Sequence, residues 1–180
     1  VEQSAPWLSI STAVPEILRK IVEDDPKAVI VENEADADFV LEATPFNQGI
    51  TAGAIWVYAL VAPFPTVIDN ITLVELMDIW SNRIGEGDTP RVLYLSEQTF
   101  AALSTIWGQP EGSNIRIANK EELLDLAWAH EKGLAIIPFE DISTRWKVLQ
   151  VDGLSPLDPK MDLSQYPLKM RFTWIVRQGL

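Results

Sequence analysis

Cysteine is absent from this chain of 180 residues, and His130 is its only histidine. The lack of cysteine excludes a disulfide framework, a thiolate nucleophile and a thiolate metal site. A single histidine leaves little from which to build a histidine-based metal site or a Ser-His-Asp triad. His130 lies beside Glu131 and Lys132 near a predicted helix C-terminus, where the helix dipole favours a structural role.

Basic residues are scarce: 14 lysines and arginines stand against 26 acidic residues, a formal net charge of −12. Nucleic acids and anionic membranes are bound through basic surfaces, so this balance argues against both as partners. Long apolar runs are also missing. The run Ile55–Ala62 has eight residues, and a membrane-spanning helix needs roughly 20. Apolar residues still make up 47% of the chain, which suffices for a sizeable core.

Strand-like apolar runs alternate with helix-like segments, which is typical of an α/β fold with parallel strands. The run Ile55–Val61 has no polar interruption, which indicates burial on both faces. We expect strands at Trp7–Ile10, Ala28–Val31, Phe39–Leu41, Ile55–Val61, Arg91–Leu95, Leu134–Ile137, Lys147–Val151 and Met170–Val176.

Helix starts are marked by capping residues. The stretch from Thr72 to Glu75 has the spacing of a capping box, and Asn119 to Glu122 repeats that spacing before another apolar run. Thr12 is placed to cap the next helix, which has Pro15 in its first turn and Ile17, Leu18, Ile21 and Val22 at helical spacing. Ser96 stands where a helix over residues 99–107 begins.

Two predicted strands end in a Pro-Phe sequence, at Ala62–Pro65 and at Ile137–Phe139. A chain that leaves one lobe and later returns to it needs two such crossings. We therefore expect two lobes, the first formed by residues 1–64 plus 140–180 and the second by residues 65–139.

With these elements placed, the chain resembles the type II periplasmic binding-protein fold in its phosphate-binding-like branch. Residues 56–81, WVYALVAPFPTVIDNITLVELMDIWS, resemble the family's return strand, hinge and helix. Residues 91–103 resemble its strand leading to a ligand-holding helix start. Residues 133–156, which include KVLQVDGLSP, resemble its second hinge crossing, and Tyr166-Pro167-Leu168 matches its usual Y-P-L before the last strand.

The resemblance implies a reduced-size, two-lobed α/β protein that closes over a small solute without catalysis, cofactor or metal. It implies an extracytoplasmic location, in the periplasm or at the cell surface, and a partner such as a membrane transporter. The phosphate-binding pattern has an arginine with a glycine-rich Ser/Thr loop, whereas this chain has Tyr94-Leu95-Ser96-Glu97-Gln98-Thr99. A carboxylate at Glu97 repels phosphate, so phosphate is not the ligand we expect.

A second resemblance is to the module that precedes the catalytic part of some capsule or poly-γ-glutamate synthesis proteins. It rests on the chain's size and on the trimmed first lobe. It implies an alternative in which the fold has lost its ligand. The domain then serves as a structural or regulatory module of a cell-envelope biosynthesis protein, through contacts with further domains.

Candidate ligand residues follow the strands, because ligands of doubly wound folds bind at the carboxyl ends of strands, near helix N-termini. Ser11 and Thr12 belong to one lobe. We expect them to face Ser96, Gln98 and Thr99 of the other lobe. The same hydroxyls can equally well serve only as helix caps. The full candidate set is Ser11, Thr12, Glu42, Thr44, Ser96, Gln98, Thr99 and Phe139.

Two further patterns have plainer interpretations. The acidic run Glu32–Asp38 lacks the glycine and closing glutamate of a calcium loop, which indicates a solvated turn. Four of the seven tryptophans fall on apolar helix or strand faces, which favours core packing over sugar stacking. They are Trp56, Trp80, Trp107 and Trp128.

Overall fold

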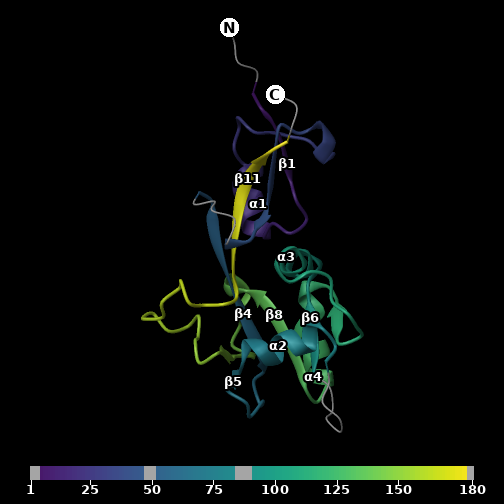
Figure 1. Ribbon diagram of the computed structural model, residues 1–180, viewed down its shortest axis with the longest axis vertical. Coiled ribbons are helices and arrows are strands. Elements are labelled where there is room, and N and C mark those ends of the chain that lie inside the picture. Colours follow the sequence, from purple (N-terminus) through teal and green to yellow (C-terminus); the bar gives the residue numbers. More distant parts are fainter. Residues whose placement is uncertain (1–4, 47–51, 84–90, 178–180) are drawn as a thin grey trace.

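A computed structural model describes residues 5–46, 52–83 and 91–177. The molecule is elongated and consists of two lobes (Figure 1). We call residues 5–46, 52–57 and 169–177 the terminal lobe, and residues 58–83 and 91–168 the central lobe, after the strands with which each part pairs. No helix in these ranges is both long enough and apolar enough to cross a membrane.

The terminal lobe holds a sheet in the order β2, β1, β3, β11 and the first part of β4. Strand β1 (Trp7–Ile10) runs parallel to both β2 (Val29–Ile30) and β3 (Phe39–Thr44) and lies between them. The short connection from β2 to β3, which contains η1 (Glu34–Asp36), therefore does not have to cross between adjacent parallel strands. Helix α1 (Glu16–Glu23) joins β1 to β2, and β11 (Lys169–Val176) runs antiparallel to β3.

The central lobe continues the sheet from β4 (Ala54–Pro63) through β8 (Gly133–Pro138) and β6 (Val92–Leu95) to β7 (Ile115–Ile117). Strands β6, β7 and β8 are parallel, but β4 is antiparallel to β8. The sheet is thus mixed, where the alternating pattern predicted parallel strands.

Lys147–Val151 pairs with strands of the part that we call the central lobe, and its expected return to the first predicted lobe, residues 1–64 plus 140–180, stays a prediction. Strand β9 (Trp146–Val148) pairs with the end of β4, and β10 (Gln150–Val151) forms a ribbon with β5 (Asn70–Ile71). The turn η4 (Phe139–Asp141) follows β8 directly and sends the chain back along the sheet that it has just left.

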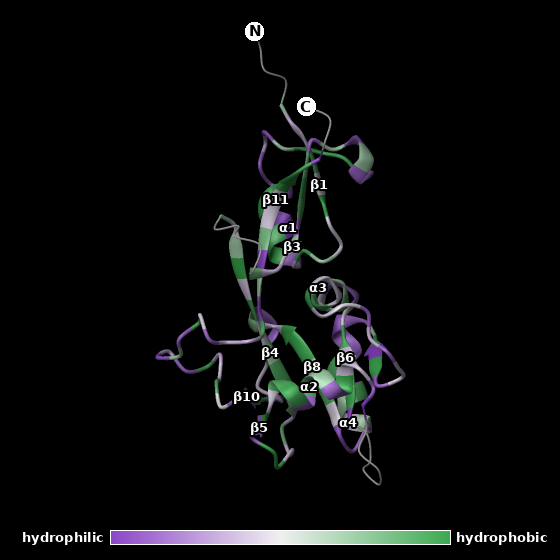
Figure 2. Cartoon of the chain, in the orientation of Figure 1, coloured by the Kyte–Doolittle hydropathy of each residue, from purple (hydrophilic) through white to green (hydrophobic). Residues whose placement is uncertain are grey.

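Helices cover both faces of the central sheet. Helices α2 (Leu73–Trp80) and α3 (Glu97–Trp107) pack on one face, and η3 (Lys120–Glu122) with α4 (Leu123–Ala129) on the other. From Tyr58 to Pro63 every residue of β4 is buried, as its apolar sequence predicts, but Ile55 is 45% exposed and Trp56 and Val57 are only partly buried, so the prediction is wrong for the start of the strand. Figure 2 shows this buried strand and its neighbour β8 in green.

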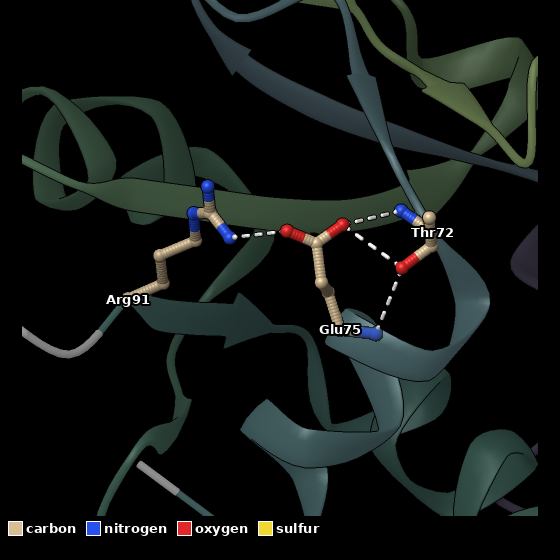
Figure 3. Close-up of polar contacts among 3 residues, drawn as sticks. All are labelled: Thr72, Glu75 and Arg91. Carbon is tan, nitrogen blue, oxygen red and sulfur yellow. Dashed lines mark hydrogen bonds and ion pairs between the residues drawn. The ribbon is translucent and has the colours of Figure 1, made fainter. Parts of the chain in front are cut away.

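The first capping box is confirmed. The Thr72 Oγ1 atom accepts a hydrogen bond from the Glu75 amide at 3.1 Å, and Glu75 Oε2 accepts one from the Thr72 amide at 2.8 Å (Figure 3). These hydrogen bonds, with the nearby guanidinium of Arg91, hold the pKa of Glu75 below its usual value. Ser96 caps α3 as expected, accepting from the Thr99 amide at 3.2 Å.

Two other capping predictions are wrong. Helix α1 begins after Pro15, which has no side-chain donor or acceptor to offer, and Thr12 lies before that cap. Asn119 precedes η3 without capping it, because its amide nitrogen is directed to Glu122 Oε2 at 3.0 Å. Asn119 and Glu122 therefore hydrogen-bond to each other through their side chains, in place of the side-chain-to-backbone hydrogen bonds of a capping box.

The turn at Asp152-Gly153 ties the C-terminal part of the chain to α2. Both residues have positive φ angles, of 52° and 76°. Asp152 Oδ1 accepts a hydrogen bond from the Leu73 amide at 3.0 Å, and the Gly153 amide donates to Asn70 Oδ1 at 2.8 Å. The Asp-Gly pair in KVLQVDGLSP is therefore required by a left-handed turn that also caps a helix.

One apolar core runs through both lobes. The buried cluster contains Ile10, Leu41 and Phe172 from the terminal lobe together with Leu60 and Leu103 from the central lobe. Helix α3 lies between the lobes in Figure 1 and packs against β3 as well as β6 and β8. The prediction of core packing holds for Trp80, which is 1% exposed, but Trp128 is 53% exposed because its side of α4 has no covering element among the described residues.

Pairing partners change inside β4, not at its end. Val57 pairs with Lys169 of the terminal lobe, and Tyr58 pairs with Pro138 of the central lobe. Pro63 is still in the central sheet, opposite Trp146. The division into residues 1–64 plus 140–180 and 65–139 remains a prediction, since strand pairing alone does not define which parts move as units.

Candidate interlobe ligand cleft

A cavity of about 480 Å³ lies where the terminal lobe meets α3. The loop after β1 forms one wall, with Ser11, Thr12 and Ala13. The other wall comes from α3 and the residue Gln109 beyond it. The cavity is therefore at the carboxyl end of a parallel strand, which is where α/β folds place their ligands.

The loop that supplies the first wall is fixed from within. The Ser11 Oγ atom accepts a hydrogen bond from the Ala13 amide at 3.3 Å. The guanidinium of Arg19 donates to the Ser11 carbonyl at 2.8 Å and to the Ile10 carbonyl at 3.3 Å. These contacts hold the loop in position, and they occupy the guanidinium with backbone oxygens.

The start of α3 separates this cavity from a second, smaller one. Glu97 lines the larger cavity, whereas Ser96 lines the smaller one, of about 180 Å³, with Lys120, Asp141 and Trp146. Ser96 Oγ also donates to the Thr99 hydroxyl at 3.0 Å, and Thr99 is fully buried. The helix start thus presents a carboxylate on one side and a lysine–aspartate pair on the other.

Lys120 links the two lobes. Its ammonium lies 2.7 Å from Asp141 Oδ1 and 4.0 Å from Glu16 Oε2, on the first turn of α1. The hydrogen bond that Lys120 donates to Asp141 raises the pKa of Lys120. The contact with Glu16 is solvent-exposed and weak, and the pair with Asp141 is the stronger of the two.

A second polar link crosses the point where β4 changes partners. Trp56, in the terminal-lobe part of β4, donates from its indole nitrogen to Glu140 Oε1 at 2.9 Å. Tyr58 is buried two residues later, and burial, with a smaller contribution from the charge of Glu140, raises the pKa of its phenol. The Tyr58 amide donates to the Leu168 carbonyl at 2.8 Å.

Only some of the ligand-binding residues predicted from the sequence line the two cavities. Ser11 and Thr12 line the larger cavity and Ser96 the smaller one. Glu42 and Thr44 do not follow β3 but belong to it; Thr44 is 2% exposed and Glu42 lies 3.9 Å from Arg177. These two residues, Gln98, Thr99 and Phe139 line neither the larger nor the smaller of these two cavities.

Sequence reasoning missed most of the α3 wall. Glu97, Phe100, Ala101, Ser104 and Thr105 line the cavity together. Their spacing of three and four residues is that of a single helix face, and four of the five side chains are small or polar. A small, polar stripe on a helix that otherwise packs in the core was the signal available in the sequence.

The described side chains offer no basis for metal chemistry. No group of three or more histidine, cysteine, aspartate or glutamate residues within residues 5–46, 52–83 and 91–177 is arranged to hold a metal ion. His130 ends α4, and its Nδ1 atom accepts a hydrogen bond from the Lys132 amide at 3.2 Å, which agrees with a structural role.

Solved structures of other proteins share this architecture. An ABC-type phosphate transport receptor from Vibrio cholerae matches 94% of this chain and 85% of its own, with a TM-score of 0.73 and 16% identity. A putative phosphate ABC transporter substrate-binding protein from Clostridium perfringens, with bound phosphate, matches 96% of this chain and 86% of its own, with a TM-score of 0.65 and 18% identity.

The architecture is not confined to transport receptors. The OxyR regulatory domain from Pseudomonas aeruginosa matches 97% of this chain and 88% of its own, with a TM-score of 0.50 and 11% identity. No family model and no curated protein sequence matches the chain. At these identities the likeness concerns the fold, and it confirms the expected one: the chain adopts the two-lobed type II periplasmic binding-protein fold at reduced size, with phosphate transport receptors among its structural neighbours.

Proposed function

We propose that this protein binds a small solute between its lobes, outside the cytoplasm and without chemistry of its own. The observation that carries the proposal is the 480 Å³ cavity between the β1–α1 loop and α3. Proteins that share the fold include transport receptors and substrate-binding proteins, which supports binding in place of catalysis. A membrane transporter that accepts the solute is the partner that this function requires.

The proposed mechanism is closure of the terminal lobe on the central lobe about β4 and the start of β11. Ser11 and Thr12 then contact the solute from one side, and α3 from the other. Ser96, Gln98, Thr99, Glu42, Thr44 and Phe139 stay candidates for a closed form in which the lobes have rotated. The exposed contact between Lys120 and Glu16 is weak enough to break and reform during such a motion.

Thermal-shift and calorimetric measurements with inorganic phosphate, other oxyanions, amino acids and sugars test the proposal. We expect at least one class to raise the melting temperature in a saturable way. Thr105→Trp fills the cavity mouth from an exposed helix position and should abolish that effect without unfolding the protein. Ala35→Trp, exposed on η1, is the matched control. Binding that survives Thr105→Trp places the ligand elsewhere and contradicts the proposal.

A second candidate is a structural or regulatory module that keeps the fold but binds no solute. The apolar core that runs through both lobes favours it, because opening the lobes exposes part of that core. In this case the domain acts through partner contacts, for example within a cell-envelope biosynthesis protein such as one that makes capsule or poly-γ-glutamate. No response to any solute class, together with a single rigid conformation in solution scattering, supports this alternative.

A further inference from the structure

We infer that the solute taken by the cavity is a small organic ammonium ion that carries hydroxyl groups, for which an amino sugar is a suitable probe. This inference rests on the proposed function, since it concerns the ligand of the same cavity. It follows from three properties of the cavity wall: its charge, its hydroxyl groups and its aromatic ring.

The charge of the wall is negative. Glu97 is the only ionisable side chain among the described residues that line the cavity, and it is exposed. The guanidinium of Arg19, on the other wall, is held by the carbonyls of Ile10 and Ser11, and its charge is paired with Glu23 at 3.8 Å. Lys120, across the helix start, is paired with Asp141 at 2.7 Å.

An oxyanion meets an unfavourable charge at this wall. The free amides at the start of α3 normally attract anions. Here Ser96 Oγ already accepts from the Thr99 amide, and Glu97 places a carboxylate at the same helix end. The Glu97 carboxylate attracts a cationic ligand and repels an anionic one with a similar interaction energy.

Hydroxyl groups supply the polar contacts of the wall. Ser104 is the clearest case: its Oγ atom is buried and has no hydrogen-bond partner among the described residues. Burying a hydroxyl without a partner is unfavourable, so a ligand that bonds this atom when the lobes move and uncover it would relieve that cost. Ser11 Oγ accepts from a backbone amide and keeps its hydrogen to donate. Thr105 Oγ1 donates to the Ala101 carbonyl at 3.1 Å and keeps its lone pairs to accept.

The aromatic ring of the wall suits the same class of ligand. Phe100 lines the cavity, and its ring centroid lies 6.0 Å from that of Trp80, which is buried. A ring fixed in this way offers a flat apolar surface to the carbon skeleton of a sugar and a favourable face to a cation.

Titration calorimetry with glucosamine, glucose and inorganic phosphate tests the inference, because glucose has the same ring and hydroxyls without the amine. We expect glucosamine to bind about twofold to fivefold more tightly than glucose, the effect of one solvent-exposed charge pair. Phosphate should give no heat. Glu97→Gln should remove the preference for glucosamine, whereas Glu32→Gln, an exposed change of equal charge on the terminal lobe, should leave it intact.

Three results overturn the inference. Equal affinity for glucosamine and glucose means that the ammonium group does not contribute to binding. Phosphate binding that Thr105→Trp abolishes means that the cavity takes an anion, and this outcome leaves the proposed solute-binding function in place. No heat from any of the three probes also excludes this ligand class. Ser104→Ala adds a separate readout: weaker binding of both sugars is expected if its hydroxyl contacts them.

Discussion

The hydroxyl of Tyr166 donates a hydrogen bond to the carbonyl oxygen of Tyr58 at 2.9 Å, inside the buried core. Two residues later the Leu168 carbonyl accepts from the Tyr58 amide at 2.8 Å. Both backbone polar groups of Tyr58 are thus held by the Tyr166-Pro167-Leu168 segment. This is the residue of β4 at which pairing passes from one lobe to the other.

Tyr166→Phe should lower the free energy of unfolding by about 1–3 kcal/mol, since it removes the donor and leaves a buried carbonyl with one partner fewer. Urea denaturation followed by fluorescence measures the change. Tyr94→Phe, a change of the same kind in a partly buried strand position, serves as the control. An unchanged midpoint for Tyr166→Phe contradicts the role assigned to this bond.

Alkaline pH should unfold the protein rather than titrate its buried tyrosines. Burial raises the pKa of both Tyr58 and Tyr166 above the ordinary value of a tyrosine, about 10. Their contribution to stability is therefore complete below a pH of about 10, the pKa of an unfolded tyrosine, and is lost as the pH rises beyond it. Absorbance at 295 nm should show these two phenols ionising together with the loss of far-ultraviolet circular dichroism. Ionisation that precedes unfolding contradicts the prediction.

Glu75→Gln should reduce stability at neutral pH and flatten its acid dependence. Because the pKa of Glu75 is lowered by the hydrogen bonds from Thr72, the ionised carboxylate stabilises the fold above its unfolded pKa, and this contribution disappears as the pH falls through the folded pKa. The capping box as a whole is worth about 1 kcal/mol. Thermal melts at neutral pH and near pH 3 should show a difference between variant and wild type at the first pH only.

Trp56→Phe should loosen the connection between the lobes. It removes the indole donor to Glu140 but keeps an aromatic ring in β4, and the lost hydrogen bond to a partly exposed carboxylate is worth roughly 1 kcal/mol. Hydrogen exchange should rise at the amides around Val57 and Leu168. Trp174→Phe, another partly exposed tryptophan of the same lobe, should not produce that pattern.

Gly153→Ala isolates the cost of a backbone angle. Nothing lies within 4 Å of the Cβ atom that alanine would add, but the φ angle of 76° is one that residues with side chains rarely adopt. We expect a loss of about 1 kcal/mol from this strain alone. Gly108→Ala has equally free space, but its φ of 78° and ψ of 179° form a combination that essentially only glycine adopts, so it should cost at least as much at the end of α3. A stabilised or unchanged Gly153→Ala variant would show that the turn adapts.

The sequence predicted those elements whose cause is local. Apolar runs predicted β1, β4 and β8, and the spacing of Thr72 and Glu75 predicted a cap that the structure confirms. Local signals were wrong where a side chain had a choice of partners. Asn119 bonds Glu122 in place of the backbone, and Thr12 lies in a loop before a helix that Pro15 begins.

The site was harder to predict because it depends on how the lobes meet. Ser11 and Thr12 could be placed in the cleft from strand order, but the α3 wall depends on which face of that helix the terminal lobe leaves uncovered. The links made by Lys120 to Glu16 and by Trp56 to Glu140 join residues more than 80 positions apart. No periodicity within one segment contains such information.

Because strand β4 belongs to both lobes, it determines whether either lobe can fold as a separate fragment. The first part of β4 pairs with β11 in the terminal lobe, and the second part pairs with β8 in the central lobe. The apolar core also continues from one lobe into the other. Each lobe needs its own part of β4 to pair with its other strands. Cutting the chain at Val57 therefore leaves unpaired strand edges on both fragments. Melting should accordingly proceed as a single cooperative event, and split genes should yield soluble protein only when both pieces are expressed together.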